Sequence, residues 1–170
     1  MENTNSGNKK TMTWIAVGCL VVIICILVVV LFGFGGLMWL GSQSPENANV
    51  QVTAPISAKV GEDVEILVTI TNTSDKAMEL SSIDFSLNFL NGFTVSQVEP
   101  PYTETSQYDA LGGDETFQSY YFYRTIAPGE TLRIVFNAKA VLSGDFSGNV
   151  DVCIDSDFNC VTNIPRTVIE

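Results

Sequence analysis

The stretch VEILVTITN, residues 64–72, alternates apolar and polar side chains along most of its length. Its apolar members recur at every second position, namely Val64, Ile66, Val68 and Ile70. Because side chains of a β-strand point alternately to its two faces, this stretch predicts a strand with one face in a hydrophobic core. Asn72-Thr73-Ser74-Asp75 favours a turn and ends the strand.

The same alternation recurs before and after this stretch. The further predicted strands span residues 50–54, 56–60, 83–89, 93–98, 119–125, 132–142, 146–154 and 160–169. In the third of these, the residues expected to face inward are Ile83, Phe85, Leu87 and Phe89. Asn91-Gly92 lies between two alternating segments, which is typical of a hairpin, with a bend or bulge as the alternative.

Residues 99–117 contain proline, glycine and acidic residues with little alternation, so they predict a long loop. No helical periodicity occurs after position 45. Seven to nine short strands with turn residues between them predict an all-β fold, an antiparallel sandwich of immunoglobulin type. A small barrel is the alternative fold.

A second kind of sequence precedes these strands. No charged residue lies between Lys10 and Glu46, and Trp14–Phe32 contains nothing polar beyond two cysteines. As a helix, these residues would extend roughly 28 Å, about the thickness of the hydrocarbon layer of a bilayer. With Trp14 and Trp39 at the two interfaces, the predicted transmembrane helix spans residues 14–40.

The basic residues predict the orientation of this helix. Lys9 and Lys10 precede it, and the next lysine or arginine is Lys59. Positively charged flanks stay on the cytoplasmic side, so the C-terminal domain is expected outside the cell. The predicted organisation is a cytoplasmic tail (1–13), an uncleaved signal-anchor helix (14–40), a polar linker (41–49) and an extracytoplasmic domain (50–170).

Three alternatives for the apolar segment follow from its residues. A cleaved signal peptide would use Ser42-Gln43-Ser44 as its small-x-small site, but the apolar run is longer than signal peptides have. A lipoprotein would use Cys19, but the run continues past it. Palmitoylation of Cys19 or Cys25 is disfavoured because both lie inside the run.

Charge and composition narrow the function classes. After position 41 lie 18 of the 19 acidic and 6 of the 8 basic residues, a balance of −12, which argues against nucleic acid and anionic lipid as partners. The chain has no histidine, the usual general base and the commonest transition-metal ligand. No catalytic constellation is recognisable, so the sequence predicts a protein that is not an enzyme.

Two segments carry a family resemblance. They are VGEDVEILVTITNTSDKAMELSSIDFSLNF, residues 60–89, and IAPGETLRIVF, residues 126–136. Together they resemble the bacterial and archaeal surface domains of the CARDB type, the cell-adhesion-related domain found in bacteria, over roughly residues 50–150. The resemblance implies a surface-exposed, non-catalytic immunoglobulin-like module and assigns no functional residue. Where CARDB domains often end in an Asn-rich segment, this chain has Cys153 and Cys160.

Cys153 and Cys160 flank the six residues IDSDFN. If the chain reverses there, the two side chains face each other across a hairpin, and an oxidising exterior would close a disulfide. The alternative is a pair of reduced, buried thiols. Within the turn, Asp155, Asp157 and Asn159 match the opening of a calcium loop. The glycine and bidentate glutamate of such a loop are absent, so a plain hairpin turn is the favoured interpretation, no cofactor is expected, and Ca²⁺ is the alternative.

The run QSYYFYR, residues 118–124, places aromatic residues on both faces of one strand. Only one face can enter a sandwich core, so one aromatic pair must point elsewhere. The candidate binding residues are Tyr102, Tyr108, Tyr121 and Tyr123, for a protein or glycan partner. The alternative is that the loop of residues 99–117 folds back and covers the outward pair. Asn72-Thr73-Ser74 is a glycosylation sequon, relevant only in a eukaryotic source.

These observations predict a single-pass protein of the cell membrane whose outer domain acts by contact, as a surface interaction or adhesion module. The alternative is an accessory or structural subunit of a larger membrane complex, assembled through the transmembrane helix. A carboxylate-dependent enzyme is a distant third interpretation.

Overall fold

The chain divides into two compact units, Met1–Ser42 and Gln43–Glu170. The computed structural model describes residues 26–28, 45, 47–110 and 112–170. The predicted cytoplasmic tail lies outside the described residues, as does the predicted transmembrane helix apart from the helical residues 26–28. Among the helices that are described, none is long and apolar enough to cross a membrane.

The second unit is built from short strands. In the described part of this unit they are β1 (Ala48–Thr53), β2 (Ser57–Ala58), β3 (Asp63–Asn72), β4 (Met78–Ser86), β5 (Phe93–Glu99), β6 (Glu104–Asp109), β7 (Thr116–Ile126), β8 (Thr131–Ala140), β9 (Gly144–Ser147), β10 (Val150–Ile154), β11 (Cys160–Asn163) and β12 (Arg166–Ile169). One helical turn, α2 (Leu87–Leu90), lies between β4 and β5.

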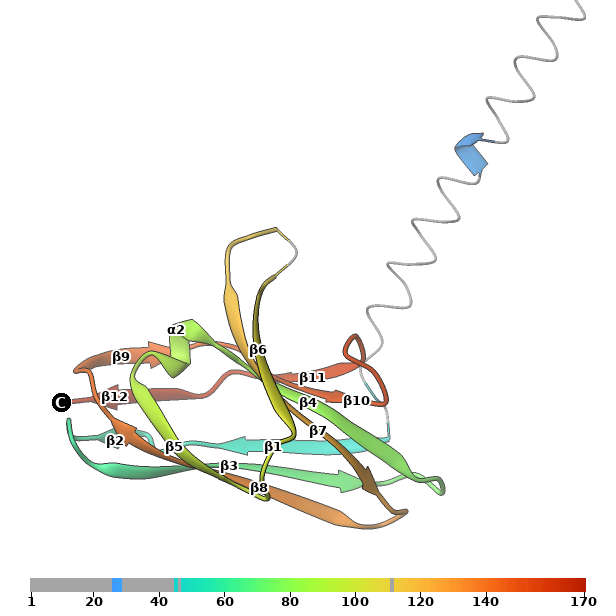
Figure 1. Ribbon diagram of the computed structural model, residues 1–170, viewed down its shortest axis with the longest axis horizontal. Coiled ribbons are helices and arrows are strands. Elements are labelled where there is room, and N and C mark those ends of the chain that lie inside the picture. Colours follow the sequence, from blue (N-terminus) through green and yellow to red (C-terminus); the bar gives the residue numbers. More distant parts are fainter. Residues whose placement is uncertain (1–25, 29–44, 46, 111) are drawn as a thin grey trace, which may run out of the picture. The chain divides into compact units, whose positions relative to one another are not determined.

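The strands form three sheets. Their orders are β1-β3-β8-β5, β11-β10-β4-β7-β6 and β2-β12-β9. All pairings are antiparallel except β2 with β12. Figure 1 shows the small third sheet gathered at the end of the unit where the C-terminus lies. The expected all-β fold with antiparallel sheets is confirmed.

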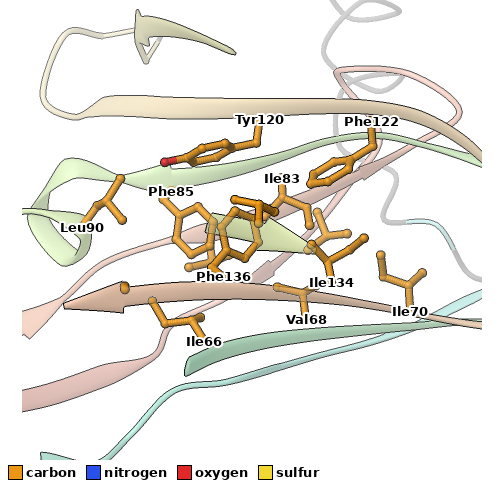
Figure 2. Close-up of a cluster of buried hydrophobic side chains, with 14 of the residues drawn as sticks. Ile66, Val68, Ile70, Ile83, Phe85, Leu90, Tyr120, Phe122, Ile134 and Phe136 are labelled. Atoms are coloured by element: carbon orange, nitrogen blue, oxygen red, sulfur yellow. The ribbon is translucent and has the colours of Figure 1, made fainter. Parts of the chain in front are cut away.

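The hydrophobic core fills the space between the two larger sheets. Phe85 of β4 and Phe136 of β8 come from opposite sheets, and their ring centroids lie 4.8 Å apart. Tyr120 of β7 contacts the same Phe136 ring edge-on at 5.1 Å. Figure 2 shows these rings between the layers, with the aliphatic side chains of β3 beside them. Burial of this much apolar surface is the main favourable contribution to folding.

The alternation in β3 and β4 explains why they face this core. Ile66, Val68 and Ile70 are fully buried, whereas Val64 is half-buried at the start of the strand. β3 lies between β1 and β8, and each of its side chains belongs either to the core or to the opposite surface. The strand predicted for residues 64–72 is therefore confirmed.

Two predictions around residues 87–92 are wrong. The predicted strand 83–89 ends at Ser86, because Leu87–Leu90 forms a helical turn that the Ser86 hydroxyl caps by accepting a hydrogen bond from Asn88 N. Asn91-Gly92 is not a hairpin, since β4 and β5 belong to different sheets. The glycine serves close packing instead: a Cβ at Gly92 would lie 2.7 Å from the Phe146 ring.

The long loop predicted for residues 99–117 is also wrong. Residues Glu104–Asp109 form β6, which pairs with β7 over six positions as the edge strand of the five-stranded sheet. Its alternation is hard to recognise because all six residues are exposed.

The strand number also differs from the expected seven to nine. The predicted strand 146–154 is two strands, β9 and β10, which belong to different sheets, and 160–169 is likewise β11 and β12. A strand can leave one sheet and join another without any break in its alternation. Apolar periodicity alone does not reveal such an exchange.

Candidate functional site

The aromatic run of β7 divides between the two faces of its sheet. Tyr120 and Phe122 are buried in the core, and each exposes 7% of its surface. Tyr121 is half-buried and Tyr123 is 49% exposed. The expected separation of the two pairs is confirmed, and a binding role for the outward pair stays a prediction.

The outer face of the five-stranded sheet, meaning the face turned away from the core, is organised in rows across the strands. Residues directly opposite each other on paired strands share a face. The first row contains Thr162, Asp151, Asp84, Ser119 and Ser106. The second contains Cys160, Cys153, Ser82, Tyr121 and Glu104. The two rows contain three acidic residues and no lysine or arginine, so this part of the face is acidic.

Asp84 lies at the centre of the first row and is only 4% exposed. Tyr108 Oη donates a hydrogen bond of 3.2 Å to Asp84 Oδ2, while Asp84 Oδ1 has no partner. Burial is the main cause that raises the pKa of this carboxyl above its usual value. Cys153 Sγ lies 3.6 Å from Oδ2, but a disulfide sulfur carries no hydrogen and cannot donate.

Two hydroxyls flank the Asp84 carboxyl. Ser82 and Ser119 are 1% and 0% exposed, and both are close enough to the carboxyl to oppose the rise of its pKa. Neither Oγ reaches a partner with normal hydrogen-bond geometry. Three buried oxygens, Asp84 Oδ1 and the two Oγ atoms, therefore lie together without partners in the centre of the outer face.

Asp151 faces Asp84 from the neighbouring strand β10. Thr162 donates a hydrogen bond of 2.6 Å to Asp151 Oδ1. Burial raises the pKa of Asp151, the hydrogen bond from Thr162 opposes the rise, and the negative charge of Glu115 adds to it. Two carboxyl groups directly opposite each other repel when both are charged.

The exposed part of the face lies on β6 and β7. Tyr121 and Tyr123 stack with their ring centroids 5.8 Å apart. Tyr123 Oη donates a hydrogen bond of 3.0 Å to Glu104 Oε1, which raises the pKa of Tyr123. Tyr108 stacks on Phe117 at 5.4 Å, and burial raises its pKa as well. The structure thus brings together three of the four predicted binding tyrosines.

Tyr102 lies apart from the other three. Its ring contacts Tyr120 edge-on at 5.3 Å, on the core side of the sheet. There it borders a groove with Val98 and Pro101, next to β5 of the other sheet. The sequence predicts a single group of tyrosines, but the segment between β5 and β6 places Tyr102 on a different surface.

The Cys153–Cys160 disulfide is confirmed. The two residues face each other in the β10–β11 hairpin, with Cα atoms 4.0 Å apart. The bridge lies in the second row of the outer face, beside Ser82. It therefore fixes the strand that carries Asp151.

The D-x-D-x-N segment forms the turn of this hairpin. Asp155 Oδ1 accepts a hydrogen bond of 2.7 Å from Glu79 N, and Asn159 Nδ2 donates one of 3.1 Å to Ile154 O. The first bond holds the turn against β4, and the second closes the hairpin itself. Nowhere in residues 45, 47–110 and 112–170 do three or more acidic or cysteine side chains form a group that could hold a metal ion, and Ca²⁺ at Asp155, Asp157 and Asn159 stays a prediction.

Asn72, the sequon residue, is fully buried. Its Nδ2 donates to Lys76 O at 2.7 Å and to Ile126 O at 2.9 Å, so both amide hydrogens are used. Its Oδ1 accepts from Ser74 N and Ser74 Oγ. The side chain links three segments of the fold, and a glycan on Nδ2 would remove these bonds.

Sequence reasoning missed Asp84, Asp151, Ser82 and Ser119. The signal present was an aspartate between large apolar residues, in Ile83-Asp84-Phe85 and again in Val150-Asp151-Val152. Alternation assigns such an aspartate to a solvent-exposed face. Alternation does not predict that β6 and the disulfide hairpin flank the centre of that face and bury it.

No protein-family model matches this chain, and no curated protein matches it. Several solved structures are similar in fold. One is a cohesin module of a family 33 glycoside hydrolase from Clostridium perfringens, with 12% identity over 72% of this chain and 96% of that chain and a TM-score of 0.40. Another, from Nocardia farcinica, is described as an immunoglobulin-like fold, with 14% identity, coverages of 71% and 96% and a TM-score of 0.45.

A third similar structure is the CARDB domain, in complex with di-metal ions, of a protein from Pyrococcus furiosus. It has 11% identity, covers 76% of this chain and 94% of that chain, and gives a TM-score of 0.39. The structural neighbours thus include the domain type that the sequence resembles and an immunoglobulin-like protein. No residue role is transferred from them.

Proposed function

We propose that this chain is a membrane-tethered, non-catalytic interaction module that binds a protein or glycan partner through the outer face of its five-stranded sheet. The observation that carries the proposal is the stacked pair of Tyr121 and Tyr123, with Glu104 hydrogen-bonded to the second ring. Exposed tyrosines provide a large contact area at low cost in conformational entropy, and their hydroxyls add polar contacts.

The position of this pair supports the proposal. β6 is the edge strand of its sheet, and all its side chains are exposed. The absence of histidine in the sequence supports a binding role over catalysis, because the usual general base is missing. The acidic character of the face favours partners with basic groups.

Site-specific photo-cross-linking on intact cells tests the proposed binding face. A benzophenone amino acid at position 123 is expected to cross-link a discrete partner. The same amino acid at position 133, an exposed position of β8 in the other sheet, serves as the control and is expected to give no such product. Cross-linking from both positions equally, or from position 133 alone, would contradict the proposed face.

The membrane tether and its orientation need a separate test. One epitope tag is added before Met1 and another after Glu170, in the full chain. On intact cells the C-terminal tag is expected to bind antibody directly, and the N-terminal tag only after permeabilisation. The reverse pattern would overturn the orientation, and release of both tags by high-salt washing would overturn the tether.

A further inference from the structure

The centre of the outer face combines two features that are unfavourable for folding. Asp84 and Asp151 are paired directly across β4 and β10, so two carboxyl groups face each other. No lysine or arginine occupies the two rows around them. A buried carboxylate without a compensating charge is costly, and burial of one is a common mark of a functional site.

The second feature is independent of the charges. Ser82 Oγ and Ser119 Oγ are buried and lack a hydrogen-bond partner. Ser82 lies on β4 two residues before Asp84, and Ser119 lies directly opposite Asp84 on β7. A buried hydroxyl without a hydrogen-bond partner costs free energy. Both hydroxyls lie close to the Asp84 carboxyl group, since each of them lowers its pKa against the effect of burial.

We propose that this cluster binds a hard divalent cation, with Asp84 and Asp151 as carboxylate ligands and the hydroxyls of Ser82 and Ser119 as neutral ligands. The donor atoms are all oxygen, which suits Ca²⁺ or Mg²⁺, whereas the nearby sulfur atoms are bridged in a disulfide and cannot act as thiolates. Two carboxylates balance the charge of the ion. Ca²⁺ accepts the irregular geometry of a mixed carboxylate and hydroxyl site better than Mg²⁺.

Tyr108 covers this cluster. Its hydroxyl contacts Asp84 Oδ2, and the residue is 40% exposed, so a rotation of this one side chain would open a path from solvent. A bound cation replaces the hydrogen bond that Tyr108 donates. The site is distinct from the D-x-D-x-N turn, where the Asp155 carboxyl is used by the Glu79 backbone.

The site belongs to this chain alone, so the inference does not depend on partner binding at Tyr121 and Tyr123. The test uses the full chain in nanodiscs free of anionic lipid. Two measurements are made as CaCl₂ is added to about 10 mM, a range that suits extracellular calcium modules. They are the Tm of the outer domain and the luminescence of Tb³⁺, a Ca²⁺ substitute excited through nearby tyrosines such as Tyr108.

The wild-type chain is expected to gain about 5 °C in Tm and to show Tb³⁺ emission that Ca²⁺ displaces. Asp84→Asn keeps the shape of the side chain and removes its charge, so both responses should be lost. Asp151→Asn, at a less buried position, should reduce the apparent affinity for Tb³⁺ at least tenfold. Asp155→Asn is the matched control and should keep both responses.

Three results would overturn the site. The first is a wild-type chain whose Tm and Tb³⁺ emission do not respond, in which case Asp84 is held as a neutral carboxyl group. The second is a response that persists in both Asp84→Asn and Asp151→Asn. The third is a response that Asp155→Asn abolishes, which would move the cation to the hairpin turn.

Discussion

Asp84 and Phe85 are neighbours in the chain and are buried to almost the same degree, 4% and 0% exposed, on opposite faces of one sheet. On the inner face, Phe85 packs against Phe136 and Tyr120, and burial stabilises the fold. On the outer face, burial leaves a carboxyl group and two hydroxyls without full hydrogen bonding. Burial to the same degree therefore stabilises the fold on the inner face and destabilises it on the outer face. The outer face, where burial is unfavourable, is the place to look for a functional site.

The inner face is tested by Phe136→Ala. This side chain is fully buried and contacts three aromatic rings, Phe85, Tyr120 and Phe122. Its removal leaves a large cavity, and the free energy of unfolding should fall by about 3–5 kcal/mol in urea denaturation. Leu142→Ala, at a side chain that is 54% exposed, is the control and should change it by less than about 0.5 kcal/mol. Similar losses for both variants would contradict the assignment of the core.

The disulfide joins β10, which carries Asp151, to the edge strand β11. Its contribution is tested by a double variant in which both Cys153 and Cys160 are replaced by alanine. The bridge joins residues seven apart, and closing so short a loop in the unfolded chain stabilises the fold by about 2–3 kcal/mol. Urea denaturation should show a loss of that size. A reducing agent should destabilise the wild-type chain to the same extent and leave the variant unchanged.

The charge on the outer face is tested by Asp84→Asn without divalent cations. Burial raises the folded-state pKa of Asp84, so between pH 4 or so and that raised value the folded state binds more protons than the unfolded state. The free energy of unfolding should therefore fall as pH rises through this window. Asp84→Asn should remove this part of the slope and be about 1 kcal/mol more stable at pH 7.

A second carboxyl group changes the free energy of unfolding with pH in the opposite direction. Arg166 lowers the pKa of the exposed Asp145 carboxyl, which gives stability that is lost as pH falls. Asp145 is unchanged in the variant, so the difference between the two pH profiles, measured by urea denaturation at each pH, removes its contribution. What remains is the titration of Asp84 together with its charge interaction with Asp151. Parallel profiles would show that the Asp84 carboxyl is not perturbed by its surroundings.

The exposed part of the outer face should contribute least to stability. Tyr123→Phe removes the hydroxyl that donates to Glu104 and keeps the stacked ring. Because both groups are exposed, Tm should change by less than about 2 °C in a thermal scan. A larger loss would mean that Tyr123 belongs to the stabilising part of the fold and would weaken its assignment to a binding face.

Elements with strict alternation could be predicted from the sequence, whereas their connections could not. Residues 64–72 form β3 as expected, and the Cys153–Cys160 hairpin is correct because both partners are close in the chain. The Asn91-Gly92 hairpin was wrong because turn residues reverse or bend a chain without specifying which sheet the next strand joins. The sequence predicts a loop in place of the exposed strand β6, because neither face of this strand is apolar.

The sequence by itself determined the all-β class and the strands that have one apolar face, because alternation is a local property of the chain. It also determined the acidic charge and the disulfide, and it predicts a membrane segment from 19 consecutive residues that are apolar apart from two cysteines. Only the tertiary structure decided that Asp84, Asp151, Ser82 and Ser119 meet. These residues lie on three strands far apart in the chain, and the depth at which they are buried depends on what the rest of the fold places over them.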